Sequence, residues 1–339
     1  MILNVFTITE LFIELVTLIV MVWAGILSLV LGLRWKPGAS RAAKVAIEER
    51  SHLVLLMSVI VMGIRLVNWP FFYATLHSLI PDIEGAMCIF GVTQVERKLC
   101  LIAELLKPIS FVLIGAWLVI HMLDERTETS VLMRSKLLLL SLTSAVVVGE
   151  SLVDAMLILR TAPGTMVTCC TTVTDILDRS TAVVPQSLLG PQYSRILSYA
   201  YVVGNMAMIL VLAVVRAFMH RSAAGTWRGP VCIMVFIAAL LNAVIFVLTQ
   251  IEVHAPVIMH LPYHRCLYCL WQYVPDTLLM YSFFVLATAG TGWAVAAERA
   301  GRTGETAQIS RAYVRRLYGL SAFCLAGALI MNTVHLFMA

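Results

Sequence analysis

Residues 10–33 read ELFIELVTLIVMVWAGILSLVLGL, in which Glu10 and Glu14 are the only charged residues. An α-helix needs about 20 predominantly apolar residues to cross the hydrocarbon core of a bilayer. The rest of the chain has a matching composition, since 60% of its 339 residues are hydrophobic, 13% are charged and the mean hydropathy is +0.92. Soluble domains are typically about a quarter charged. This stretch therefore predicts a membrane-spanning helix in an integral membrane protein.

Seven further apolar runs of similar length follow along the chain. The predicted spans are residues 10–33, 51–75, 99–122, 136–160, 196–219, 231–253, 274–297 and 314–337. The connections between them are too short to form a separate soluble domain. We expect an all-α bundle of eight transmembrane helices that forms a single polytopic membrane domain over residues 1–339.

The Lys and Arg residues alternate between the two sides of the predicted bundle. Sixteen of the 24 lie in or beside the connections at 34–50, 123–135, 220–230 and 298–313. Loops rich in Lys and Arg remain cytoplasmic, so both termini are predicted on the outer side. The expected location is a bacterial inner (plasma) membrane. Short basic loops suit lipid headgroups, and no nucleic acid partner is expected.

Cysteine is concentrated in the three outer connections, at residues 76–98, 161–195 and 254–273. Each of these connections also contains methionine or histidine. Thiolate, thioether and imidazole together favour soft or borderline metals, chiefly copper(I) and, for thiolate with imidazole, zinc. The predicted metal ligands are Met87, Cys88, Met166, Cys169, Cys170, His260, His264, Cys266 and Cys269.

Two other interpretations use the same cysteines. The pair Cys266 and Cys269 has Cys-x-x-Cys spacing just before the seventh span, where helix-end amides would stabilise a thiolate. These two residues would then be catalytic in thiol–disulfide exchange or quinone-linked electron transfer, with quinone as the cofactor. Alternatively, the outer cysteines form structural disulfides between loops.

Ionisable residues inside the spans gather in their outer halves. Such residues normally face the bundle interior or a water-filled cavity, and they often mark a functional site. The predicted cofactor-binding or cation-binding set is Arg65, Glu104, Lys107, Glu150 and Asp154. The alternative is that opposite charges pair and simply lock neighbouring helices together.

These features favour a membrane protein that handles a soft metal ion, in transport or in metal-site assembly. The second hypothesis is a thiol–disulfide or electron-transfer protein, and the third is a structural subunit of a larger membrane complex. Expected partners are the lipid bilayer, other membrane subunits, and a periplasmic or extracellular carrier of metal or electrons. No Gly-rich phosphate loop or His-Glu-x-x-His motif is present, and the sequence leaves open whether the protein is an enzyme.

Overall fold

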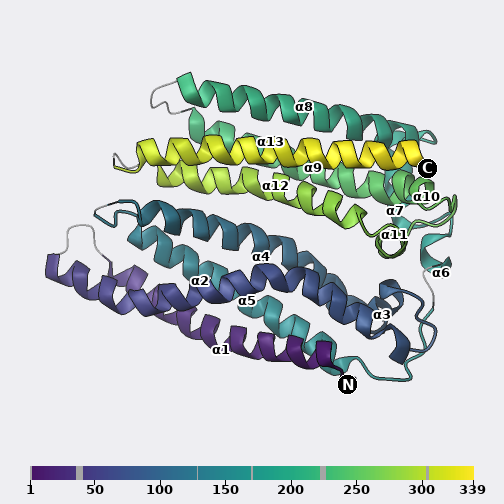
Figure 1. The fold of residues 1–339 in the computed structure, drawn as a ribbon, viewed down its shortest axis with the longest axis horizontal. Coiled ribbons are helices and arrows are strands. Elements are labelled where there is room, and N and C mark those ends of the chain that lie inside the picture. Colours follow the sequence, from purple (N-terminus) through teal and green to yellow (C-terminus); the bar gives the residue numbers. More distant parts are fainter. Residues whose placement is uncertain (1, 36–40, 128, 169–170, 222–226, 303–304) are drawn as a thin grey trace. The chain divides into compact units, whose positions relative to one another are not determined.

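The computed structural model describes residues 2–35, 41–127, 129–168, 171–221, 227–302 and 305–339. Every regular element within these ranges is helical (Figure 1). The described residues form two compact units. Unit 1 comprises residues 1–84, 92–167 and 300–307, and unit 2 comprises residues 85–91, 168–299 and 308–339.

Unit 1 is built from four long helices. They are α1 (Val5–Arg34), α2 (Arg41–Ser78), α4 (Arg97–Asp124) and α5 (Met133–Arg160). Helix α1 packs along α5 and α2, and α4 packs on α5 (Figure 1). The Asn4 side chain caps α1 by accepting from the Thr7 amide at 2.9 Å, and the Thr7 hydroxyl accepts from the Asn4 amide. This reciprocal pair satisfies backbone donors that a helix start otherwise leaves unpaired.

Short elements follow α2 on the way to α4. These are a 3₁₀ turn, η1 (Ile80–Asp82), and the helix α3 (Ile89–Val95). The core of unit 1 forms around the fully buried side chains of Met21, Trp117 and Leu137. The Trp117 indole N–H donates to the Lys136 carbonyl at 3.1 Å, so even the largest core side chain has its polar atom paired.

Unit 2 contains the other four long helices and several short ones. In chain order they are α6 (Thr171–Thr174), α7 (Ser180–Leu189), α8 (Tyr193–Arg221), α9 (Arg228–Thr249), the π-helical turn η2 (Gln250–His254), α10 (Ala255–Ile258), α11 (Leu267–Tyr273), α12 (Thr277–Ala300) and α13 (Ala307–Met338). Helix α8 packs on α9. The rings of Phe246 and Phe284 stack at 3.8 Å between centroids and join α9 to α12.

The structure confirms the prediction of eight long apolar helices. Among the described residues, eight helices are long and apolar enough to cross a membrane. Several extend beyond the apolar windows, and α2 begins at Arg41 rather than at 51. Residues 42–50, AAKVAIEER, include four charged residues but mostly favour helix. Hydropathy therefore marks the apolar section of this helix and not its first residue.

Small residues allow α1 and α5 to approach closely. A Cβ added at Gly25 would lie 3.0 Å from the Ser144 Cβ, whereas a Cβ added at Gly63 on α2 would meet no atom within 4 Å. We expect Gly25→Leu to lower the free energy of unfolding by about 1–3 kcal/mol through overpacking. The matched control, Gly63→Leu, is expected to change it by less than about 0.5 kcal/mol. Reversible unfolding in detergent measures both, and equal effects would contradict this packing.

Candidate metal centre

Three buried cysteine thiols meet in unit 2. The sulfur atoms of Cys88, Cys266 and Cys269 lie within 4.8 Å of one another. The three residues are 3%, 2% and 6% exposed. They come from two segments that are far apart in the sequence, so the cluster exists only in the folded chain.

Local backbone structure brings the two halves of this thiol cluster together. Cys266 is the N-cap residue of α11, and Cys269 lies in the first turn of that helix, so a spacing of three places both on the same side. Cys88 directly precedes α3, and its carbonyl accepts from the Gly91 amide at 3.0 Å. Gly85 has φ 84°, a conformation that glycine adopts without steric cost, and it turns the chain towards Cys88.

The surroundings of the thiol cluster are mostly apolar. Phe90, Met259 and Tyr268 pack against it, and the rings of Phe90 and Tyr268 lie 6.4 Å apart. Hydrogen bonds with the Cys266 and Cys269 thiols lower the pKa of the Cys88 thiol, and burial opposes this effect only in part. The cluster therefore offers three mutually close sulfur donors together with a neighbouring thioether.

The other predicted metal ligands lie in different surroundings. Met87 and Met166 are 74% and 80% exposed. His260 is exposed and has φ 55°, and the Nδ1 atom of His264 lies 2.9 Å from Asp175 Oδ1. Cys169 and Cys170 lie outside the described residues. Met259, which the prediction left out, packs on the thiol cluster, and the only sequence signal for it was its place one residue before His260.

The structure describes six cysteines, and none of these six forms a disulfide. Besides the thiol cluster they are Cys100, Cys232 and Cys324, all buried within long helices. None of these six therefore links two loops as a disulfide in this structure.

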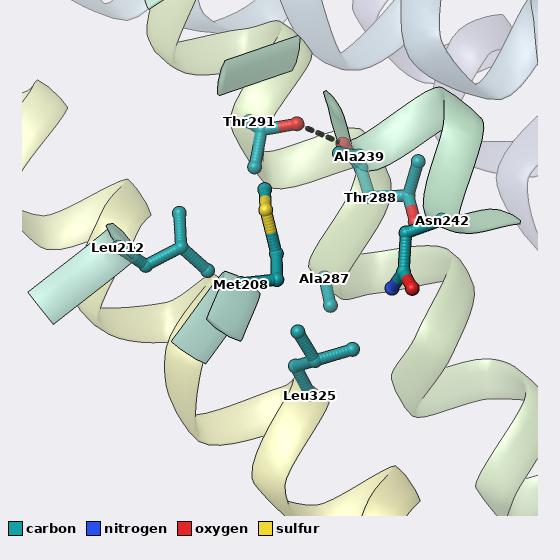
Figure 2. Close-up of a pocket in the computed structure, with 8 residues that line it drawn as sticks. All are labelled: Met208, Leu212, Ala239, Asn242, Ala287, Thr288, Thr291 and Leu325. Carbon is teal, nitrogen blue, oxygen red and sulfur yellow. Dashed lines mark hydrogen bonds between the residues drawn. The ribbon is translucent and has the colours of Figure 1, made fainter. Parts of the chain in front are cut away.

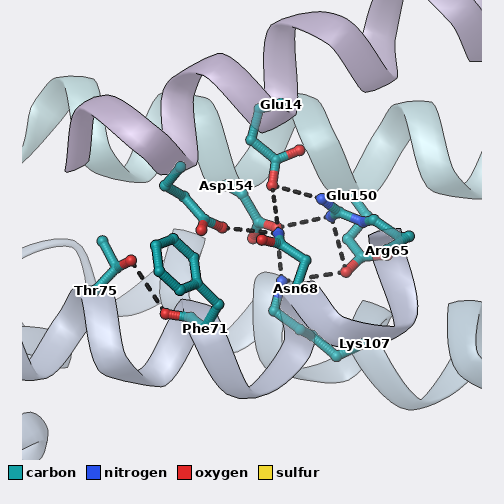
Figure 3. Close-up of polar contacts among 9 residues, drawn as sticks. Glu14, Arg65, Asn68, Phe71, Thr75, Lys107, Glu150 and Asp154 are labelled. Carbon is teal, nitrogen blue, oxygen red and sulfur yellow. Dashed lines mark hydrogen bonds and ion pairs between the residues drawn. The ribbon is translucent and has the colours of Figure 1, made fainter. Parts of the chain in front are cut away.

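A buried ion network occupies unit 1 (Figure 3). Arg65 on α2 contacts Glu14 Oε1 at 2.5 Å, Asp154 Oδ2 at 2.8 Å and Glu150 Oε1 at 2.9 Å. The Lys107 Nζ atom on α4 contacts the same Asp154 and Glu150 oxygens at 2.6 and 3.1 Å. It also lies 4.0 Å from the centroid of the Phe72 ring. Four of the five residues predicted as a cofactor-binding or cation-binding set thus meet in one place.

The fifth predicted residue, Glu104, is half-buried on α4, where it accepts a weak hydrogen bond from the Cys100 thiol at 3.9 Å. The network instead includes three residues that the predicted set omitted, namely Glu10, Glu14 and Asn68. The Asn68 side chain donates to Glu10 Oε1 at 2.9 Å and to Glu14 Oε1 at 3.1 Å. The spacing of four between Glu10 and Glu14, which places both on one face of α1, was the available signal.

Two further features of unit 2 bear on how it is held together. The Arg179 guanidinium, just before α7, forms a bidentate ion pair with the buried Glu252 of η2, and the Tyr193 hydroxyl also donates to Glu252.

A small gap lies between α8, α9, α12 and α13 (Figure 2). Its lining is mainly apolar. Asn242 donates to Asn205 at 3.0 Å, and the hydroxyls of Thr288 and Thr291 donate to backbone carbonyls, so we interpret it as a packing gap.

Over the residues that the structure describes, the fold is all-helical, eight helices are long and apolar enough to cross a membrane, and three cysteine donors are buried together. Comparison with protein-family models, with curated proteins and with solved structures found no match to this chain.

Proposed function

We propose that this chain is an integral membrane protein with both termini on the outer side, and that it binds a soft metal ion through Cys88, Cys266 and Cys269. The role proposed is transport of that ion or its delivery to a metal site. One observation carries the proposal: three buried thiols from distant segments lie within 4.8 Å of one another. The proposed location is a bacterial inner membrane, with a periplasmic or extracellular metal carrier and other membrane subunits as partners.

Copper(I) is the metal that these surroundings favour most. Thiolate and thioether ligands select copper(I) over harder ions, and Met259 places a thioether beside the three thiols. Zinc is the second candidate, but a closed zinc site usually has four ligands in tetrahedral geometry. With three cysteines, zinc would need one further donor, such as water.

A second candidate function is thiol–disulfide exchange. Exchange requires a thiolate to attack a disulfide sulfur, and the third cysteine of the cluster lies close enough to attack a bond between the other two. Cys266 and Cys269 would then be catalytic, with a quinone or a redox carrier as the electron partner. The metal proposal predicts that all three cysteines stay reduced in the resting protein, whereas the redox proposal predicts a disulfide that forms and opens in turnover.

A copper(I) titration of the reduced, detergent-purified protein tests the metal proposal. We expect one tightly bound ion per chain, with affinity measured by competition against a chromogenic copper(I) chelator. Cys266→Ser should weaken binding by about 100-fold or more, because loss of even an outer-shell partner costs roughly 10–100-fold. Cys324→Ser, which changes a buried cysteine of α13 outside the cluster, is the matched control and should leave the affinity unchanged.

Two results would count against the metal proposal. One is the absence of copper(I) or zinc uptake by the reduced protein, and the other is uptake that Cys88→Ser, Cys266→Ser and Cys324→Ser affect equally. A mixed disulfide trapped after mutation of Cys269 alone would favour thiol–disulfide exchange instead.

A further inference from the structure

The ion network of unit 1 has more negative than positive side chains. The ionisable groups that face one another there are Glu10 and Glu14 from α1, Arg65 from α2, Lys107 from α4, and Glu150 and Asp154 from α5. Each is at most 4% exposed. Four carboxyl groups thus face two cationic groups, and the fully ionised network would bury two uncompensated negative charges. Such charges are very costly in a medium of low dielectric constant.

The excess of negative charge is greatest at Glu10. Both cations are used elsewhere, because Arg65 contacts Glu14, Glu150 and Asp154, and Lys107 contacts Glu150 and Asp154. Glu10 makes no ion pair within the described part of the chain. Its only hydrogen-bond partner there is the neutral Asn68 amide, which donates to Oε1.

Several buried oxygen atoms at and around Glu10 have no hydrogen-bond donor. Glu10 Oε2, Glu14 Oε2 and Asp154 Oδ1 are buried and have no hydrogen-bond partner. The three carboxyl groups nevertheless place oxygens within 4.8 Å of one another. Asn68 points its Nδ2 atom at two of them, which leaves its own buried Oδ1 atom without a donor as well. Since ionised carboxylates only accept, these neighbours cannot satisfy one another unless hydrogens are added.

We infer that this carboxylate cluster is a proton-binding site that holds two protons, one of them on Glu10. Each proton comes from water and forms an O–H bond to a carboxylate oxygen, which removes one unit of negative charge. A protonated Glu10 then becomes a donor and can bond to the free oxygen of Glu14 or Asp154. Two such protons neutralise the network and provide donors for the unpaired oxygens around Glu10.

A hard metal ion fits the same place less well. Calcium takes six to eight oxygen ligands, and magnesium demands near-ideal octahedral geometry. The unpaired oxygens of Glu10, Glu14, Asp154 and Asn68 supply only four. The charged heads of Arg65 and Lys107 also contact Asp154 and would repel a divalent ion beside it.

The position of Glu10 suits exchange of its proton with water. Glu10 is five residues from Val5, where α1 begins, a distance of about 7.5 Å at the helical rise of 1.5 Å per residue. Carboxyl groups near one end of a membrane helix are the kind of residues that form proton relays in transporters.

The inference goes beyond the proposed metal function and is independent of it, because the thiol cluster lies in unit 2 and this site in unit 1.

Infrared difference spectroscopy on the full-length, metal-free protein tests the inference. At neutral pH we expect the carbonyl absorption of protonated carboxyl groups, shifted when H₂O is replaced by D₂O. Glu10→Gln should remove the part of this absorption that belongs to one of the two protons. Glu49→Gln, which changes an exposed glutamate of α2, should remove none.

Either of two results would overturn the inference. The first is a wild-type spectrum without protonated carboxyl absorption at neutral pH, which can be read even if Glu10→Gln does not fold. The second is stoichiometric calcium, magnesium or sodium in the purified protein that Glu10→Gln removes, since that would make the ligand a metal ion. Failure of copper(I) binding at the thiol cluster would leave the infrared result untouched.

Discussion

Replacing Arg65 with methionine is expected to lower the free energy of unfolding by about 3–5 kcal/mol. Arg65 is 4% exposed and contacts Glu14, Glu150 and Asp154. Methionine fills much of the same volume but leaves the four buried carboxyl groups of the network with Lys107 as the remaining cation. The loss should be smaller at low pH, because protonation of the carboxyl groups removes the repulsion that the substitution creates.

Reversible unfolding of the detergent-purified protein at two pH values measures this loss. The matched control is Arg97→Met, since Arg97 is exposed at the start of α4 and its replacement should cost less than about 0.5 kcal/mol. Similar small costs for both variants would mean that the network contributes little to stability. A loss independent of pH would argue against the buried negative charge that this substitution is expected to leave uncompensated.

Replacing Arg179 with methionine is expected to cost about 3 kcal/mol, at the lower end for breaking a buried ion pair. Arg179 donates to both carboxylate oxygens of Glu252 and to the Ile176 carbonyl at 2.9 Å. Glu252 is fully buried in η2, and without Arg179 its described partners would be the Tyr193 hydroxyl at 3.0 Å, the Thr181 side chain and the more distant Arg265. This contact ties the connection before α7 to η2, which follows α9.

The effect of Arg179→Met should be local. We expect faster amide hydrogen exchange over residues 171–190 and little change within α1 and α5. Arg195→Met, which changes an exposed arginine of α8, provides the comparison and should alter neither stability nor exchange. Unchanged exchange in Arg179→Met would show that other contacts hold this connection.

The number of long helices could be predicted from the sequence because the bilayer imposes a length on each apolar run. The run at residues 10–33 lies inside α1, and the run at 231–253 lies inside α9 and η2. The π-helical turn could not be foreseen, because the polar residues Gln250, Glu252 and His254 do not distinguish a π-helical turn from a further turn of α-helix. The sequence also carries no periodic signal for α3 and α11, which are only two turns long.

The thiol cluster was only partly predictable. Cys266 and Cys269 are paired by their spacing, which is a local property. Their approach to Cys88 depends on the path of two irregular loops, which hydropathy does not describe. For the same reason Met87, next to Cys88, was predicted as a ligand although its side chain is 74% exposed.

The ion network was foreseen more fully because helical spacing determines which side chains share a face. Glu150 and Asp154 are four apart on α5, and Lys107 meets both. Which partner each cation selects depends on how the helices pack. That packing directs Arg65 to three carboxyl groups and leaves Glu10 with Asn68 alone.

X-ray absorption at the copper edge, on wild-type protein loaded with one copper(I) ion per chain, tests the proposed thiol site most directly. The account predicts a metal surrounded by sulfur, with about three sulfur neighbours and no imidazole scattering, as expected for thiolate ligands. The Cys88→Ser protein should lose one of these sulfur neighbours. A copper ion bound by nitrogen and oxygen alone, or one whose sulfur neighbours persist in that variant, would contradict a metal site at Cys88, Cys266 and Cys269.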